Sequence, residues 1–182
     1  CIRDRLWTSL YLSLAAAGGG VLLLFFLTFG VCRIPRAWAK LVYLVSVLPV
    51  GVPGLVLGLS YIFAFNSPST PLYALYGSAA LIALCNFYHY HTQGFLTMMT
   101  GMRAVPQALE EAVSCLGGGT LHIVRDAVLP QIAPTVLGVF FFLFMRSMVT
   151  LSAVIFLVTP SVSVAPVSVL RLDEAGFVSQ AA

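Results

Sequence analysis

The sequence predicts an all-α, polytopic bundle of transmembrane helices, and three observations support this fold class. Of the 182 residues, 60% are hydrophobic and only 8% are charged, which is too few charges for an ordinary soluble domain. The mean hydropathy is +1.01, and apolar stretches long enough to cross a bilayer recur between short polar breaks. The apolar residues do not alternate every second position, as the strands of a membrane barrel would.

We expect a single transmembrane domain over residues 1–182. Four spans are predicted, at about residues 6–31, 41–65, 72–97 and 133–158. The chain opens at Cys1 and stops at Ala182 in a run of small residues, so we interpret it as a fragment that lacks its ends. Residues 159–182 are then an outer loop and the start of a further helix.

The second predicted span is dense in residues that break helices, among them Pro49, Gly51, Pro53, Gly54 and Gly58. A bundle tolerates such residues where other helices, side chains or a cavity satisfy the freed backbone groups. Two interpretations follow. Either this span is a kinked helix that only packs, or the segment around Pro53 and Gly54 lines a translocation path.

The third predicted span ends in a polar and aromatic stretch that contains His89 and His91. Two residues apart, they lie on different faces of a helix, and no further histidine, cysteine or carboxylate is in local sequence reach. We therefore expect packing near the membrane interface, with no metal site and no cofactor.

Arg146 is the one charge deep in an apolar segment. At 1.5 Å per residue it lies roughly 20 Å along the fourth span from Ala133, beyond the midplane towards the outer side. A charge at this depth is costly, so its side chain should face a partner or water.

The distribution of positive charge predicts the orientation. The residues expected inside are Arg33, Arg36, Lys40, Arg103 and Arg125, and those expected outside are Arg3, Arg5 and Arg171, which have acidic neighbours. With this orientation the N-terminus of the chain is outside, and the central polar loop, at about residues 99–130, is cytoplasmic.

Residues 106–134 are the longest polar interruption in the chain, and they predict two short helices at an angle. Pro106 suits the start of the first helix, and three glycines beginning at Gly117 suit its end. Thr120 is expected to cap the second helix, and Pro130 to close it.

Five residues of this loop stand at a characteristic spacing: Glu111, Ala112, Gly117, Leu129 and Pro130. The pattern resembles the EAA signature of the inner-membrane permeases of binding-protein-dependent ABC importers: EAA, three residues, G, nine residues, I-x-LP. The sequence departs from it at Val113, for alanine, and at Ala127, for isoleucine. Both replacements are apolar for apolar.

The resemblance implies a permease subunit that forms a substrate path across the inner membrane and is not an enzyme. ATP hydrolysis would fall to a partner, and no GxxxxGK[ST] loop occurs in the sequence. The five matching residues would belong to a helix that couples the permease to the ATPase. The implied partners are cytoplasmic ABC ATPase subunits, a periplasmic solute-binding protein, a second permease copy or fused half, and the lipid bilayer, without nucleic acid.

Within this family, residues 54–66, 150–161 and 167–176 resemble permeases of the 2-aminoethylphosphonate type, which are close to the ferric-iron type. The implied substrate is 2-aminoethylphosphonate, another small anion or ferric iron. If it is an anion, Arg146 could attract it on its way through. Alternatively, Arg146 pairs with backbone carbonyls or with a polar group of a partner subunit.

Two other functions stay open. A membrane-embedded metalloenzyme would use His89, His91 and His122, and it would need further acidic or histidine ligands near them. A passive channel subunit would transport without dependence on ATP. Neither function explains the spacing of the EAA signature.

Overall fold

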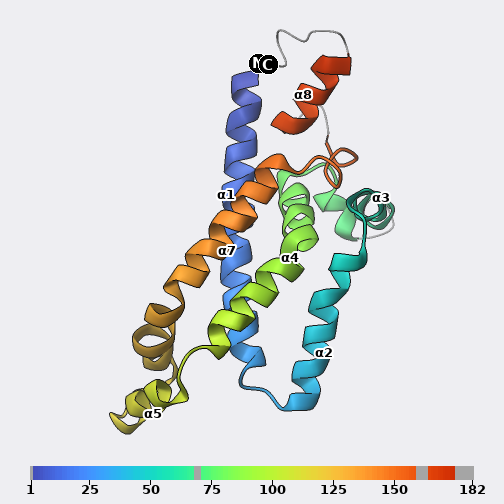
Figure 1. The fold of residues 1–182 in the computed structure, drawn as a ribbon. Coiled ribbons are helices and arrows are strands. Elements are labelled where there is room, and N and C mark those ends of the chain that lie inside the picture. The colour runs from blue at the N-terminus through green and yellow to red at the C-terminus, as the bar shows by residue number, and fades with distance from the viewer. Residues whose placement is uncertain (1, 68–70, 159–163, 175–182) are drawn as a thin grey trace.

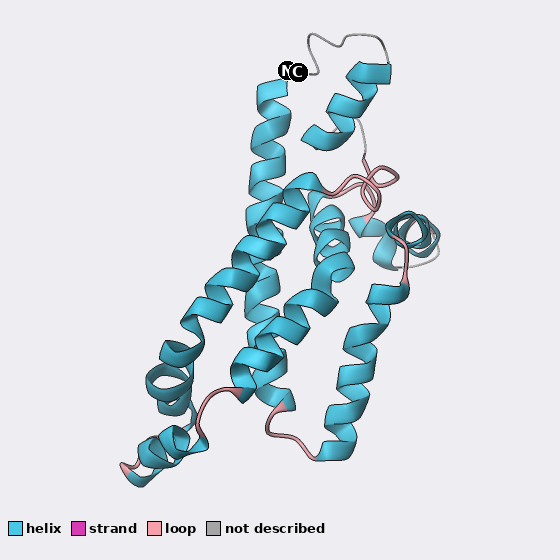
Figure 2. Ribbon diagram, in the orientation of Figure 1, coloured by secondary structure: helices cyan, strands magenta, loops and turns pink. Residues whose placement is uncertain are grey.

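The computed structural model describes residues 2–67, 71–158 and 164–174, and this part of the chain consists of helices joined by turns and short loops, without a strand (Figure 2). The long helix α1 (Ile2–Val31) runs along most of the molecule (Figure 1). Helices α4 (Ala79–Arg103) and α7 (Leu129–Val149) pack against α1 and against each other. The predicted all-α class is confirmed.

The three central helices share an apolar core. Leu24, Phe95 and Leu143, one from each helix, are almost completely buried in it. A second apolar cluster, which includes Leu12, lies nearer the N-terminal end of α1. Gly20 permits the close approach of the helices, because a Cβ atom there would lie 2.5 Å from the Phe87 ring of α4.

Two polar side chains of α4 are bonded to other elements of the bundle, whereas Asn86 Oδ1 and the Nδ1 atoms of His89 and His91 are buried without a hydrogen-bond partner in the described chain. The Asn86 side-chain amide donates a 2.9 Å hydrogen bond to Ser147 Oγ of α7, and Thr92 Oγ1 donates a 2.9 Å bond to the Ser46 carbonyl. Leu6–Val31 and Thr120–Val149 are long and apolar enough to cross a membrane, and one bent helix pair would add a third span. Helix α4 lies between the other helices, so the Asn86 amide and the Thr92 hydroxyl make these two bonds away from lipid.

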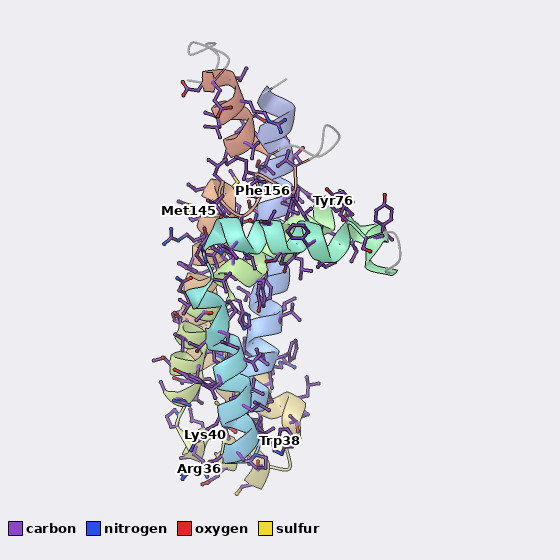
Figure 3. All side chains as sticks on the ribbon, turned by 90° about the vertical axis from the view of Figure 1, so that its right-hand side faces the viewer. Arg36, Trp38, Lys40, Tyr76, Met145 and Phe156 are labelled. Atoms are coloured by element: carbon purple, nitrogen blue, oxygen red, sulfur yellow. The ribbon has the colours of Figure 1, made fainter. Side chains whose placement is uncertain are left out.

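The second predicted span is not one kinked helix. The structure divides it into α2 (Arg36–Val47), a short 3-10 turn η1 (Leu48–Gly51) and α3 (Gly54–Phe65). The α2–η1 segment and α3 are bent by 107°, and α3 crosses the bundle, as the two perpendicular views show (Figures 1 and 3). Pro53 explains the break, because it cannot continue the hydrogen-bond ladder and favours extended backbone before it.

Two other spans differ from their predicted limits. Helix α4 follows a 3-10 turn, η2 (Pro71–Leu75), and begins at Ala79 instead of residue 72 because the Ser78 hydroxyl caps it by accepting a bond from the Leu81 N–H. Helix α7 ends at Val149 instead of residue 158, since the backbone becomes extended at Thr150 and turns follow.

The C-terminal part of the described chain is α8 (Ala165–Glu174), which lies beside the first half of α1. The Ala165 N–H donates a 2.7 Å hydrogen bond to Ser9 Oγ of α1. Helix α8 corresponds to the further helix expected near the end of the sequence. The other parts of that expectation, residues 159–163 and 175–182, lie outside the described residues.

The second short helix of the polar loop does not stop at Pro130. Instead α6 (Thr120–His122), a π-helical turn η3 (Ile123–Val128) and α7 form one helix, Thr120–Val149, of 30 residues. The Leu129 N–H bonds the carbonyl of Val124, five residues back. This wider turn accommodates Pro130, whose ring would clash with a carbonyl in regular α geometry. Gly119, not Thr120, occupies the N-cap position.

Candidate functional site

Helix α5 (Gln107–Cys115) lies at one end of the molecule, beyond the ends of α4 and α7 (Figure 1). None of its residues is buried. Two leucines close to it are also exposed, Leu116 at 89% and Leu121 at 76%. This loop, residues 104–122, therefore presents polar and apolar side chains that the described chain does not cover.

The end of α5 is a Schellman motif. The Gly117 N–H bonds the Ser114 carbonyl at 3.0 Å, and the Gly118 N–H bonds the Val113 carbonyl at 2.9 Å. Gly117 has a φ of +81°, which glycine adopts without the steric cost that other residues meet. The glycine of the EAA pattern is thus the residue that stops the helix.

The structure separates the five residues of the EAA pattern into two groups: three belong to α5 and its glycine stop, Gly117, and two to the start of α7. Glu111 and Ala112 are exposed on α5, where Glu111 accepts a 2.8 Å hydrogen bond from the Gln107 side chain. Leu129 and Pro130 follow the π turn at the start of α7 and are also exposed. Because α5 packs against η3, the second group shapes the helix on which the first group rests.

An ion pair that the sequence did not predict ties α5 to the bundle. Arg33, just beyond α1, contacts the Glu110 carboxylate at 2.6 Å, and its guanidinium lies 3.5 Å from the centroid of the Phe29 ring. Both charged side chains are about one third exposed, at 32% and 29%, so the pair stabilises the fold by only about 0.2–1 kcal/mol. Its main effect is to position α5.

A second candidate site surrounds Arg146. Together with Leu55, Tyr90, Thr150 and other residues, Arg146 lines a cavity of about 450 Å³. The Arg146 guanidinium carbon lies 5.5 Å from the centroid of the Tyr90 ring, and Thr150 Oγ1 lies 2.9 Å from the Tyr90 hydroxyl. No described carboxylate forms an ion pair with Arg146.

Pro53 and Gly54, the candidate path residues of the second predicted span, do not line this cavity, but Gly54 lies against a residue that does. A Cβ atom on Gly54 would lie 2.5 Å from the hydroxyl oxygen of Ser152, which also lines the cavity. Pro53 is exposed and directly precedes α3. The fold therefore brings the start of α3 and the end of α7 together, although they are far apart in sequence.

The three histidines do not converge. His91 stacks on Phe95 with ring centroids 5.9 Å apart, and His89 contacts Tyr90 edge-on at 4.5 Å. His122 is exposed on α6, at the α5 end of the molecule. Among the described residues, no three histidine, cysteine or acidic side chains gather in a way that could hold a metal ion. The metalloenzyme alternative therefore finds no ligand set there.

Apolar helices with an uncovered polar loop at one end define a multi-pass membrane protein. The chain belongs to the family of binding-protein-dependent transport system inner membrane components, whose profile matches residues 20–173. The expected family is thus confirmed. Members of this family are membrane components of transport systems and not enzymes. The expectation that the chain is not an enzyme is therefore confirmed as well.

Curated relatives agree with this family. Ferric transport system permease protein FbpB of Actinobacillus pleuropneumoniae is 32% identical over 137 residues, covering 75% of this chain and 20% of the relative. Putative ferric transport system permease protein FbpB 1 of Haemophilus influenzae is 32% identical over 162 residues, covering 87% and 25%. The chain therefore spans only a fifth to a quarter of these relatives.

A solved structure supports the fold. The crystal structure described as an amino acid ABC transporter with histidines has a TM-score of 0.62 and 17% sequence identity. The match covers 97% of this chain and 79% of that chain. Nearly the whole chain therefore shares the fold of an ABC transporter chain.

The α5 end yields a prediction about stability. Gly117→Ala should destabilise the protein by about 1–2 kcal/mol, because alanine meets a steric cost at positive φ. Gly138→Ala is the matched control, since Gly138 lies inside α7, does not have a positive φ, and a Cβ atom there would meet no neighbouring atom within 4 Å. Thermal unfolding in detergent should show a lower melting temperature for the first variant only. Equal melting temperatures for the two variants would contradict the assigned role of Gly117.

Proposed function

We propose that this chain is the membrane-spanning permease core of an ABC importer and that α5 is its coupling helix, which docks on a cytoplasmic ATPase subunit. The observation that carries the proposal is the exposure of α5 on a rigid support. Its residues are uncovered, yet the Arg33 ion pair and the packing on η3 hold it in place. Glu111 offers a carboxylate for a basic partner residue.

The continuous helix Thr120–Val149 supplies a route from this contact to the membrane. From Leu129 to Arg146 it extends about 25 Å at 1.5 Å per residue. A displacement of α5 by the ATPase would therefore tilt α7 and move Arg146 relative to α3 across the cavity that the two helices share. Such rocking would open the path alternately to the two sides of the membrane.

Positive charge supports a cytoplasmic position for the α5 end. Arg33 and Arg103 lie there, and Arg36 and Lys40 lie at the corresponding end of α2 (Figure 3). The opposite end would face the periplasm and a solute-binding protein. Exposed apolar residues of α3, such as Phe63 at 74%, suit contact with lipid, a second permease copy or a fused half.

We propose that the cargo passes Arg146 as an anion. The names of the relatives favour iron, but a guanidinium without a carboxylate partner among the described residues would repel bare Fe³⁺. A ferric complex with anionic ligands, or a small oxyanion such as 2-aminoethylphosphonate, would be attracted instead. Tyr90 and Thr150 add hydroxyl groups at the same cavity.

Glu111→Lys tests the coupling role. In the protein assembled with its ATPase, the variant should reduce substrate-stimulated ATP hydrolysis and uptake about tenfold or more, because a charge pair buried on docking is replaced by repulsion. Asp173→Lys carries the same charge change on α8, at the opposite end of the molecule, and should leave both activities unchanged. Unchanged coupling in Glu111→Lys would refute the proposed contact. Uptake that needs no ATP would favour a passive channel.

Arg146→Gln tests the path. Uptake of anionic substrate should fall about tenfold, while the variant still assembles with the ATPase and hydrolyses ATP at the basal rate. Met145→Gln, one residue earlier on α7 and 60% exposed, is the control and should retain uptake. Radioactive ferric citrate and 2-aminoethylphosphonate would be compared as substrates. Wild-type uptake of both by Arg146→Gln would exclude Arg146 from the path.

A further inference from the structure

A larger cavity, about 1000 Å³ in volume, lies at the α5 end of the molecule. It is lined by the C-terminal ends of α1 and α4, by the start of α2 and by α5. Its charged lining consists of four cations and one carboxylate: Arg33, Arg36, Lys40, Arg103 and Glu110. The volume is at the upper end of the roughly 300–1,000 Å³ of pockets that hold organic ligands. The lining thus carries three more positive than negative charges.

Most of this positive charge has no partner in the described chain. Glu110 pairs with Arg33, whereas Arg36, Lys40 and Arg103 form no ion pair with any described residue. Like charges around one cavity repel each other and concentrate anions within it. The cavity is therefore suited to a negatively charged group.

Part of the rest of the lining is apolar, and several of these apolar residues lie on the side of the cavity nearer the middle of the bundle. On α2, Tyr43 and Leu44 line the cavity about one to two turns beyond Lys40 and Arg36, and Leu44 is 63% exposed. Val31 of α1 and Met99 of α4 line the same side. A free phosphate ion would interact only with the basic side of the cavity. A phospholipid would interact with both sides, the headgroup with the basic residues and an acyl chain with the apolar ones.

We propose that this cavity binds the headgroup phosphate of an anionic phospholipid, with the first part of an acyl chain along Tyr43 and Leu44. Basic pockets between membrane helices on the cytoplasmic side hold such headgroups. Trp38, 63% exposed on the first turn of α2, suits the interface next to the headgroups. That this cavity lies on the cytoplasmic side of the membrane rests on the proposed function.

The lipid would also help to hold α5, the proposed coupling helix, in place. Gln107 and Glu110 of α5 line the same cavity as Arg36 and Lys40 of α2. A phosphate bound by Arg36, Lys40 and Arg103 would therefore connect α2 and α4 directly beside α5. The lipid composition of the membrane would then set how firmly α5 is held.

Two cysteines allow a direct test. Cys32 lines the cavity, and Cys115 is exposed on α5 at the same end but does not line it. Two forms of the full chain would each keep one of these as their single cysteine. Both would be placed in nanodiscs of phosphatidylcholine alone or with phosphatidylglycerol, and the rates of N-ethylmaleimide labelling compared. Cys115 reports the general effect of an anionic surface on a thiol, and labelling requires no transport.

Phosphatidylglycerol should slow the labelling of Cys32 relative to Cys115 by about fivefold or more. Replacing Arg36, Lys40 and Arg103 together by Gln should abolish the difference, and Lys40→Gln alone should reduce it. Arg125→Gln, an exposed arginine outside the cavity lining, should not change it. A Cys32-to-Cys115 ratio that is equal in both membranes would overturn the proposal. Equal protection by inorganic phosphate in phosphatidylcholine would overturn the lipid as occupant in favour of a free anion.

Discussion

The feature on which the rest depends is the continuity of the helix Thr120–Val149 through its π turn. A proline in the middle of a helix normally breaks it, but the wide turn before Pro130 lets the chain pass from the exposed loop into the bundle without interrupting the helix. Because of this continuity, α5 rests on the same helix that carries Arg146. A contact at one end of the molecule and the open cavity that Arg146 lines thereby adjoin the same helix.

Weak interactions at the α5 end complete this arrangement. The exposed Arg33–Glu110 pair contributes little to stability, but it fixes α5 against the end of α1. The basic cavity lies directly behind this pair, so a bound lipid and the ion pair would act on the same helix. Helix α5 is therefore held by contacts that a partner or a membrane can adjust, and none of its residues is buried.

Local patterns made much of the site predictable. The end of α5 follows from Gly117, since only its own φ and two backbone hydrogen bonds are needed, and the EAA spacing identified the family. The 107° bend after η1 and the π turn before Pro130 were not predicted. A proline in the sequence indicates where regular α-helical geometry is disrupted, but it does not determine the bend angle or turn type that results. The Arg33–Glu110 pair, 77 residues apart, and the approach of Gly54 to Ser152 depend on tertiary packing that no local spacing encodes.

The central claim is that the helix Thr120–Val149 moves as a rigid unit when the ATPase closes. Spin labels at His122→Cys and Val149→Cys, with the other cysteines replaced, would report the distance along this helix in the complete transporter. A second pair, at His122→Cys and Ser60→Cys, would report its distance to α3. The account predicts that trapping the ATPase in its closed state shifts the second distance by several ångströms and leaves the first unchanged. A first distance that changes as much as the second would show that the helix bends at the π turn, and would contradict the account.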